Sequence, residues 1–503
     1  MSRTAPDRPP GAHPAGSGEP PAHPGVVGAM CACVAVVIGM VTAINLAVPS
    51  LGASSLHPSA SALLWIVDTY VVLFACLVIL GGAAGDRFGR KRVLLGGLGL
   101  FAVGSLVCGV APSVPVMLVG RAITGIGGAF VLPNTLAILV VAVPVERRGR
   151  AIAAWASMTG LGGVLGNVVG GALLTAGSWR WLFLAAVPIA LACAGWVAFA
   201  APTTSRHARP LQPLSALLLT LACLALLIGI IQGPEDGWTS PTVIAGFALA
   251  AVLLAVWATH ELRSAHPLLD PRLFRIGRLR RACTGLLGLF LATFSFFYLN
   301  ASFLQYGRGW SVLLTGVAIV PMTAAIIVGS RLAGRAAARV GAAATLAVAF
   351  ALVGVGLLAL SRCTGATPYA VYAVVIVAIG LGLGLALPGL SADIAGSLPP
   401  DQAGVGSGLQ ATTRELGAAL GVAIVGTIVT SRFVSGLPAS LRDRSDPPHT
   451  VAEALASVHT AADRAVVLHA FVSAADSGFA VVGILTAVVG AVVVGSLRRR
   501  AAE

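Results

Sequence analysis

Long apolar stretches separated by short polar segments dominate this chain. A helix needs roughly 20 apolar residues to cross a hydrocarbon core about 30 Å thick, and many stretches here are that long. The pattern predicts about fourteen membrane spans. We place them near 27–48, 62–82, 93–111, 115–136, 151–174, 182–201, 214–232, 242–259, 282–304, 312–333, 343–361, 369–391, 405–430 and 474–496.

Composition supports a membrane protein. Of the 503 residues, 57% are hydrophobic and 10% are charged, whereas about a quarter of an average soluble domain is charged. This small number of charges cannot cover the surface of a large soluble protein. We therefore expect the lipid bilayer to cover most of the surface of this protein. The net charge of +14 comes mainly from arginines in short loops, which indicates membrane topology and not a nucleic-acid partner.

The arginines also predict the orientation. Basic clusters occur in alternate loops, whereas most loops between them carry little charge; the exception is the long segment after Thr430, which mixes both signs. Because cytoplasmic loops are enriched in Lys and Arg, we expect both termini in the cytoplasm. The basic clusters are Arg87–Arg92, Arg147–Arg150, Arg206–Arg209, Arg263–Arg281, Arg331–Arg339 and Arg498–Arg500.

The two halves of the chain resemble each other. Asp86-Arg-Phe-Gly89 has a counterpart in Ala338-Arg-Val-Gly341, and 338 − 86 = 252. Such repeats are typical of transporters built from two six-helix halves. We therefore predict an all-α integral membrane fold of two six-helix bundles plus two extra central transmembrane helices. The expected parts are a disordered cytoplasmic tail (1–26), the first bundle (27–201), a linker with the extra helices (202–281), the second bundle (282–496) and a cytoplasmic tail (497–503).

The loop after the second span carries the most particular motif. Glycine allows sharp turns and close backbone approach, and a carboxylate is favoured beside a helix N-terminus. We interpret this loop as a gate in which Asp86 contacts a neighbouring helix; the plainer alternative is a basic loop that only fixes topology. The gating residues are Gly82, Asp86, Arg87, Gly89, Arg90 and Lys91.

Ionisable residues inside spans are functional candidates because burying them is costly. We expect Asp68 to carry the proton and Arg121, at similar depth, to act on it. The alternative is that Asp68 only caps a helix end beside Trp65. Arg414 and Glu415 lie near mid-depth. Since neighbouring residues diverge on a helix, we expect that they do not pair with each other and that one faces the cavity and the other a neighbouring helix. A structural ion pair to another span is the alternative.

Few other polar groups lie at membrane depth. The expected proton-coupling residues are Asp68, Arg121 and Glu415, and the expected substrate-cavity residues are Asn45, Trp65, Tyr70, Asn167, Gln305 and Arg414. Glycines recur every four residues in the fifth predicted span, which predicts close helix contact. This glycine stripe is Gly162, Gly166 and Gly170, with Gly171 beside it.

Taken together, these motifs resemble the major facilitator superfamily, and within it the fourteen-helix drug:proton antiporter family. They are Gly82–Arg92, Trp65–Tyr70, Leu118–Gly127, Gly162–Gly171 and Trp179–Phe183. The resemblance implies two bundles rocking about a midplane site. It also implies that a puromycin-type or similar antibiotic-resistance exporter is one candidate. Met40 stands where that family has an acid, Asn167 where it has proline and Thr124 where it has glutamine.

The expected function is export of small amphipathic drugs or antibiotics, cationic ones among them, driven by the proton gradient. The alternatives are a proton-coupled uptake symporter and an exporter of a non-drug metabolite. We find no nucleotide motif, metal-ligand cluster or catalytic constellation, so we expect no cofactor, no metal and no enzymatic activity. The protein is expected to act as a monomer in a bacterial cell membrane.

Overall fold

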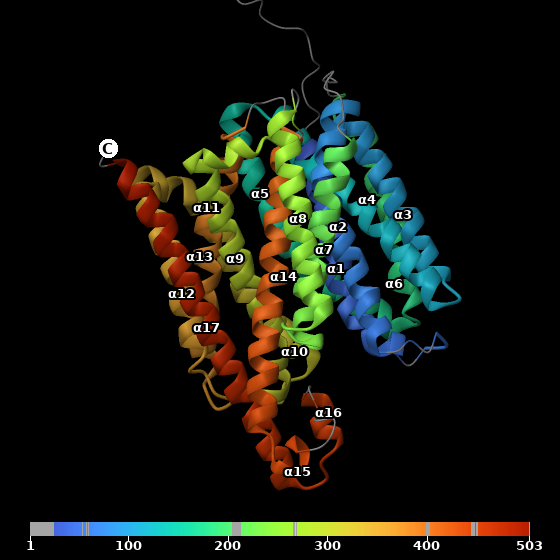
Figure 1. Cartoon of the computed structure of the whole chain (residues 1–503), viewed down its shortest axis with the longest axis vertical. Helices are drawn as coiled ribbons and strands as arrows, with labels where there is room; N and C mark the ends of the chain where they lie inside the picture. The colour runs from blue at the N-terminus through green and yellow to red at the C-terminus, as the bar shows by residue number, and fades with distance from the viewer. Residues whose placement is uncertain are drawn as a thin grey trace, which may run out of the picture.

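The computed structural model describes residues 25–52, 54–56, 58, 60–203, 213–264, 267, 269–398, 403–443, 448 and 451–501, and every regular element among them is a helix. Figure 1 shows long helices running roughly side by side. The tail predicted at 1–26 lies outside the described residues, apart from Gly25 and Val26.

The first bundle contains six helices, each with an apolar sequence long enough to span a bilayer. They are α1 (Val26–Gly52), α2 (Ala60–Phe88), α3 (Arg90–Val110), α4 (Val114–Ala142), α5 (Val145–Ala176) and α6 (Arg180–Ala200).

The second bundle repeats this arrangement with more irregular helices. Its first helix continues into a short π-helix, η2, and α10 continues into α11 after a brief break. The elements are η1 (Pro271–Arg275), α9 (Gly277–Ser302), η2 (Phe303–Gly307), α10 (Val312–Ala318), α11 (Val320–Val340), α12 (Ala342–Leu360), α13 (Tyr369–Ala395), α14 (Ala403–Gly436) and α17 (Ala461–Ala501).

Helix pairing follows the same rule in both bundles. In the first, α1 packs on α5, α2 on α4 and α3 on α6; in the second, α9 packs on α14, α11 on α13 and α12 on α17. Each pair occupies the corresponding place in its half. The internal repeat seen in the sequence is therefore a repeat of helix packing.

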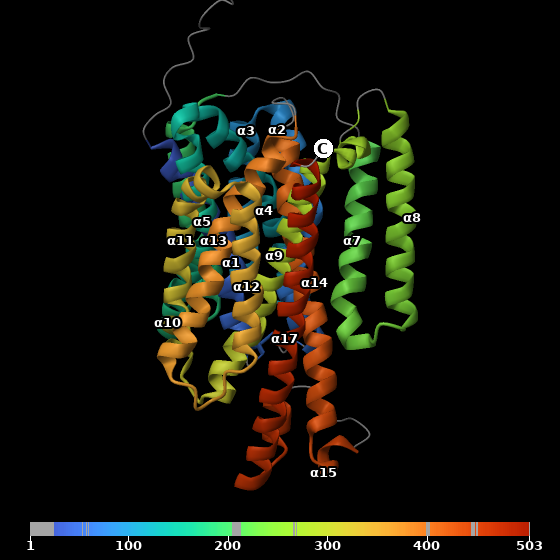
Figure 2. The same cartoon turned by 90° about the vertical axis from the view of Figure 1, so that its left-hand side faces the viewer.

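Between the halves lies a hairpin of α7 (Pro213–Asp236) and α8 (Pro241–Arg263). It stands outside the two bundles, where α7 contacts both α2 and α14 (Figure 2). At the hairpin turn, Trp238 Nε1 donates to Thr427 Oγ1 of α14 at 2.9 Å. At its other end, Ser215 of α7 bonds Glu261 and Trp257 of α8. The hairpin thus covers the line where α2 and α14 meet.

The number of spans agrees closely with the sequence pattern. Within the part of the chain that the structure describes, thirteen helices are long and apolar enough to cross a membrane. At the predicted seventh span, α7 has a shorter apolar section, Leu217–Gly233. The all-helical membrane fold is confirmed, and the exact count of fourteen stays a prediction.

The long segment after Thr430, expected as a loop, contains further helical structure. α14 continues to Gly436, and the short helices α15 (Ala439–Arg442) and α16 (Val451–Ala456) lead into α17. α17 has 41 residues, so it is roughly 60 Å long, about twice the thickness of the hydrocarbon core. These elements form an extension beyond the bundles (Figures 1 and 2), held by a small apolar core. That core includes Phe433, Leu437, Leu441, Ala454, Val467 and Phe471.

Truncating this core should loosen the extension. Leu441 is 1% exposed, and shortening a buried leucine costs about 2–5 kcal/mol. We expect Leu441→Ala to speed amide hydrogen exchange in α15 and α16 at least tenfold, whereas Val466→Ala, at a 46% exposed position of α17, should leave it unchanged. Equal protection in both variants would contradict the packed extension.

Candidate functional site

Arg121 of α4 is fully buried and is held by the backbone of α2. Its Nε donates to the carbonyl of Ile66 at 2.7 Å, and its Nη2 donates to the carbonyl of Val67 at 3.1 Å. Asp68 follows Val67 directly in α2. Two carbonyls therefore fix Arg121 against the segment of α2 that carries Asp68, and the pairing of Asp68 with Arg121 stays a prediction.

The same guanidinium lies over an aromatic ring. Arg121 Cζ is 4.7 Å from the ring centroid of Tyr70, within the range of a cation–π attraction. Tyr70 donates its hydroxyl to the carbonyl of Val37 in α1 at 3.1 Å, and it stacks on Phe74 with centroids 6.0 Å apart and planes at 5°. Residues four apart share a helix face, which explains the stack.

The second bundle contributes another buried arginine, which lies beside the ring of Phe74. Arg414 of α14 places its Cζ 5.6 Å from the ring of Phe74. Its Nε and Nη2 donate to Glu415 Oε1 at 2.9 Å and 2.5 Å. The expectation that Arg414 and Glu415 do not pair with each other was wrong, because the long arginine side chain bends across the helix surface to reach its neighbour.

These contacts form one continuous set, which we call the arginine–aromatic stack: Arg121, Tyr70, Phe74, Arg414 and Glu415. All five side chains are at most 8% exposed. Burying charges costs several kcal/mol per ion unless partners compensate. Here carbonyls, ring faces and one carboxylate provide that compensation, and the stack joins α4 and α2 of the first bundle to α14 of the second.

Further contacts close the seam between α2, α4 and α14 on one side of the stack. Ser407 Oγ donates to the carbonyl of Pro133 at 3.0 Å, and Thr412 Oγ1 lies 3.4 Å from the carbonyl of Ala75. A Cβ on Gly408 would come within 2.7 Å of Ile79 Cα. Helices α2 and α14 run antiparallel, and Ile79 of α2 lies beside Gly408 of α14. Asp86, seven residues further along α2, is therefore level with the start of α14.

The predicted gating loop is tightly structured. Arg90 Nη2 lies 2.9 Å from Asp86 Oδ1, and Arg90 Nη1 donates to the carbonyl of Ala137 at the end of α4. Lys91 Nζ donates to the carbonyls of Ala198 and Ala201 at the end of α6. Cations are favoured at helix C-termini, so the loop ties α2 and α3 to two other helix ends.

Glycines in and near this loop have different roles. Gly89 has a φ of 97°, which favours glycine and permits the turn from α2 to α3. Gly82 is buried within α2, and Arg87 lies over the adjacent ring of Phe88. The close approach of α2 to α4 occurs at Gly81 and at Gly85, where a Cβ would meet Ala129 O and Asn134 Oδ1. Sequence reasoning missed these two, although their spacing of four was a usable signal.

The glycine stripe packs α5 against α1. A Cβ on Gly162 would meet Ala35 Cα at 3.0 Å, one on Gly166 would meet Gly39 Cα at 2.6 Å, and one on Gly170 would meet Ala43 Cβ at 2.9 Å. Thr42 Oγ1 adds a hydrogen bond to the carbonyl of Gly163 at 2.9 Å. For Gly171 the nearest atom is 3.9 Å away, so it does not belong to the contact.

The second bundle repeats this contact residue by residue. Gly417 and Gly421 of α14 lie against Leu287 and Leu291 of α9. These positions follow their counterparts in the first bundle by a nearly constant shift, since 417 − 162 = 255 and 287 − 35 = 252. The repeated glycines therefore mark the same close helix crossing in each half.

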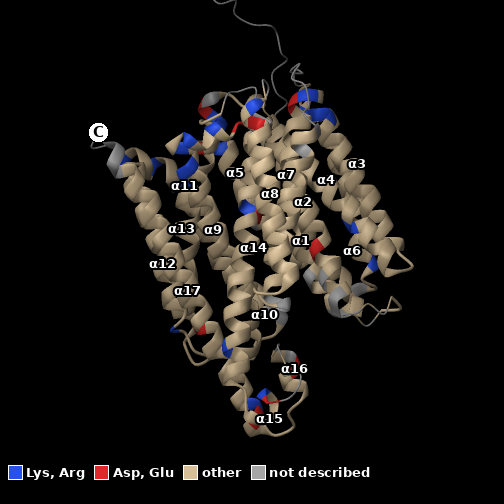
Figure 3. Cartoon of the chain, in the orientation of Figure 1, with Lys and Arg blue, Asp and Glu red and all other residues tan. Residues whose placement is uncertain are grey.

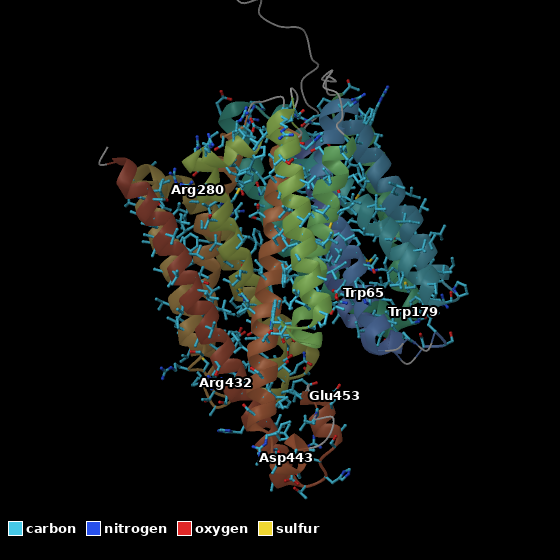
Figure 4. The ribbon with its side chains drawn as sticks, viewed as in Figure 1. Trp65, Trp179, Arg280, Arg432, Asp443 and Glu453 are labelled. Carbon is cyan, nitrogen blue, oxygen red and sulfur yellow. The ribbon has the colours of Figure 1, made fainter. Side chains whose placement is uncertain are left out.

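The remaining cavity candidates do not converge on the stack. Trp65 is half-buried and lies toward the end of the first bundle where Trp179 also lies (Figure 4). Asn167 is exposed on α5, and Gln305 is half-buried in η2 at the end of α9. The side chain of Asn45 lies outside the described residues.

Two departures from the family pattern have simple local roles. Met40, at the position of the missing acid, is buried in the apolar core. Thr124 donates its hydroxyl to the carbonyl of Gly120 one turn earlier, at 2.7 Å. Neither side chain supplies a titratable carboxylate, so neither replaces the acid that the family has in its first span.

A methyl group on the glycine stripe tests its packing. Gly166→Ala would place a Cβ 2.2 Å from the carbonyl oxygen of Gly39, which forces α1 and α5 apart. Overpacking of this kind costs typically about 1–3 kcal/mol, so we expect a lower melting temperature in detergent. Gly171→Ala, five residues along the same helix, should melt like the unmodified protein. Equal melting of the two variants would refute the close crossing.

Two six-helix bundles with buried charges at their seam define a membrane transporter of the secondary type. The chain matches the Major Facilitator Superfamily model over residues 30–422 and belongs to that superfamily. It is a multi-pass membrane protein.

Known relatives agree with this assignment. The chain is 32% identical to the methylenomycin A resistance protein of Streptomyces coelicolor, over 78% of this chain and 82% of the relative. It is 30% identical to the multidrug efflux pump LfrA of Mycolicibacterium smegmatis, over 89% and 91%. Among solved structures, the human organic anion transporter MFSD10 shares the fold with a TM-score of 0.63 and 18% identity, over 93% of this chain and 98% of that one.

Proposed function

We propose that this protein is a secondary exporter that moves small amphipathic drugs or antibiotics out of the cell in exchange for protons and so confers resistance. The observation that carries the proposal is the fully buried Arg121, which the carbonyls of Ile66 and Val67 hold beside Asp68. The named resistance and efflux functions of the relatives support the same assignment. Transport of this kind requires no enzymatic step, and a single chain contains both bundles.

In this proposal Asp68 carries the proton. The carboxylate form of Asp68 attracts the positive guanidinium of Arg121. Protonation of Asp68 removes that attraction. Loss of the attraction weakens the hold of α2 on Arg121 and thus changes the stack that reaches α14. Proton binding and drug binding then compete, because each favours a different arrangement of the same seam.

The gating loop is proposed to control the inner side. Asp86 lies level with the start of α14, where a helix N-terminus favours a negative charge. The contacts of Ser407 and Gly408 with the first bundle lie on the same side of the stack. We infer that these contacts hold the inner side closed and separate when the bundles rock.

The charge distribution supports termini in the cytoplasm. Lys and Arg gather mainly at the end of the molecule that carries the C-terminus, and the extension at the opposite end carries both signs (Figure 3). Cytoplasmic segments are enriched in basic residues. On this assignment the extension lies outside the cell, beside the mouth through which the drug leaves.

Removal of the proposed proton carrier tests the function. In proteoliposomes, Asp68→Asn should lower drug transport driven by a pH difference at least tenfold, because asparagine cannot exchange a proton. Drug binding should also lose its dependence on pH. The matched control is Asp443→Asn, which removes an exposed acid paired with Arg442 on the extension and should transport normally.

Everted membrane vesicles decide the direction of transport. The proposal predicts accumulation of drug inside them, with collapse when a protonophore is added. Uptake into right-side-out vesicles under the same gradient would instead support the symporter alternative. Unchanged transport by Asp68→Asn at normal abundance would contradict the assigned proton carrier.

A further inference from the structure

The arginine–aromatic stack contains groups that a cationic drug would seek. Amphipathic cations bind to aromatic faces and to buried carboxylates. Here the ring of Phe74 and the carboxylate of Glu415 both face one cation, Arg414. The protein thus supplies its own cation to a site suited to binding one.

The other ring is occupied in the same way. Arg121 lies 4.7 Å over Tyr70 and is fixed by two backbone carbonyls. Each ring of the stacked pair therefore carries a guanidinium. Arg121 thus lies against the segment of α2 that carries Asp68.

The burial of Arg414 and Glu415 determines how strongly they hold each other. Arg414 is 6% exposed and Glu415 is 8% exposed, so solvent does little to weaken their attraction. A positively charged guest has to displace Arg414 from Glu415 and then leave that guanidinium without a partner, which is costly. An uncharged guest, or one bearing carbonyl or carboxylate acceptors, meets no such penalty.

We infer that Arg414 is a specificity-determining residue that excludes permanent cations and selects uncharged or acceptor-bearing amphipathic substrates. The inference rests on the proposed function, since it assumes that the seam around the stack binds the transported compound. The sequence suggests amphipathic substrates that include cationic compounds. The inference removes permanent cations from that class.

Two probes that differ by one N-methyl group and the positive charge it brings test the inference. The first is an uncharged acridine at pH 8, and the second is its N-methylated permanent cation. Fluorescence anisotropy measures the dissociation constants of both for the full-length protein in lipid nanodiscs. We expect the unmodified protein to bind the uncharged probe at least tenfold more tightly than the cation.

Substitutions test whether Arg414 causes the preference for the uncharged probe over the cation. Arg414→Met should improve cation binding relative to the uncharged probe at least tenfold, because it releases the ring of Phe74 and the carboxylate of Glu415. Arg414→Lys keeps the positive charge and should keep the preference. Arg432→Met, at an exposed position of the same helix, is the matched control and should also keep it.

The outcomes separate this inference from the proposed function. Equal or tighter cation binding by the unmodified protein would overturn the inference, as would an unchanged preference in Arg414→Met. If Arg414→Met does not accumulate in the membrane, Arg414→Gln replaces it, with the same expected direction. Failure of proton-driven export of the uncharged probe, with the binding preference intact, would count against the proposed function alone.

Discussion

The cost of burying arginine charge at the seam between the bundles is the constraint on which the rest of the structure depends. Arg121 and Arg414 are held where lipid and protein exclude water, and such charges persist only with compensating partners. Backbone carbonyls, two stacked rings and Glu415 supply them. Because those partners come from both bundles, any change of charge at the seam also changes how the bundles meet.

The packing around the seam suits such a coupled change. Within each bundle, glycines bring helices into backbone contact, as at Gly166 on Gly39 and Gly421 on Leu291. Between the bundles, α14 contacts the first bundle through Ser407, Gly408 and Thr412. The accessory hairpin crosses the same seam from outside and is bonded to α14 through Trp238. Alternating access moves one such bundle against the other around a site between them.

Much of this could be predicted from the sequence because apolar length and glycine spacing act locally. The bundle repeat, the Gly162–Gly170 stripe and the neighbourhood of Asp68 and Arg121 all follow from such patterns. The pairing of Arg414 with Glu415 was missed because helix geometry gives the direction of the Cα–Cβ bond and not the path of a long, flexible side chain. Phe74 was missed because an aromatic residue in an apolar span has no distinguishing pattern until a cation from another bundle lies over it. The helices after Thr430 were missed because their mixed charges concealed a short apolar core.

Proton release on drug binding tests the central claim most directly. A pH indicator in weakly buffered solution reports protons released when an uncharged substrate is added to the purified protein. If the drug and the proton compete through Asp68, binding releases protons from the unmodified protein and releases none from Asp68→Asn. Drug binding without proton release by the unmodified protein, or equal release by the variant, would contradict the account.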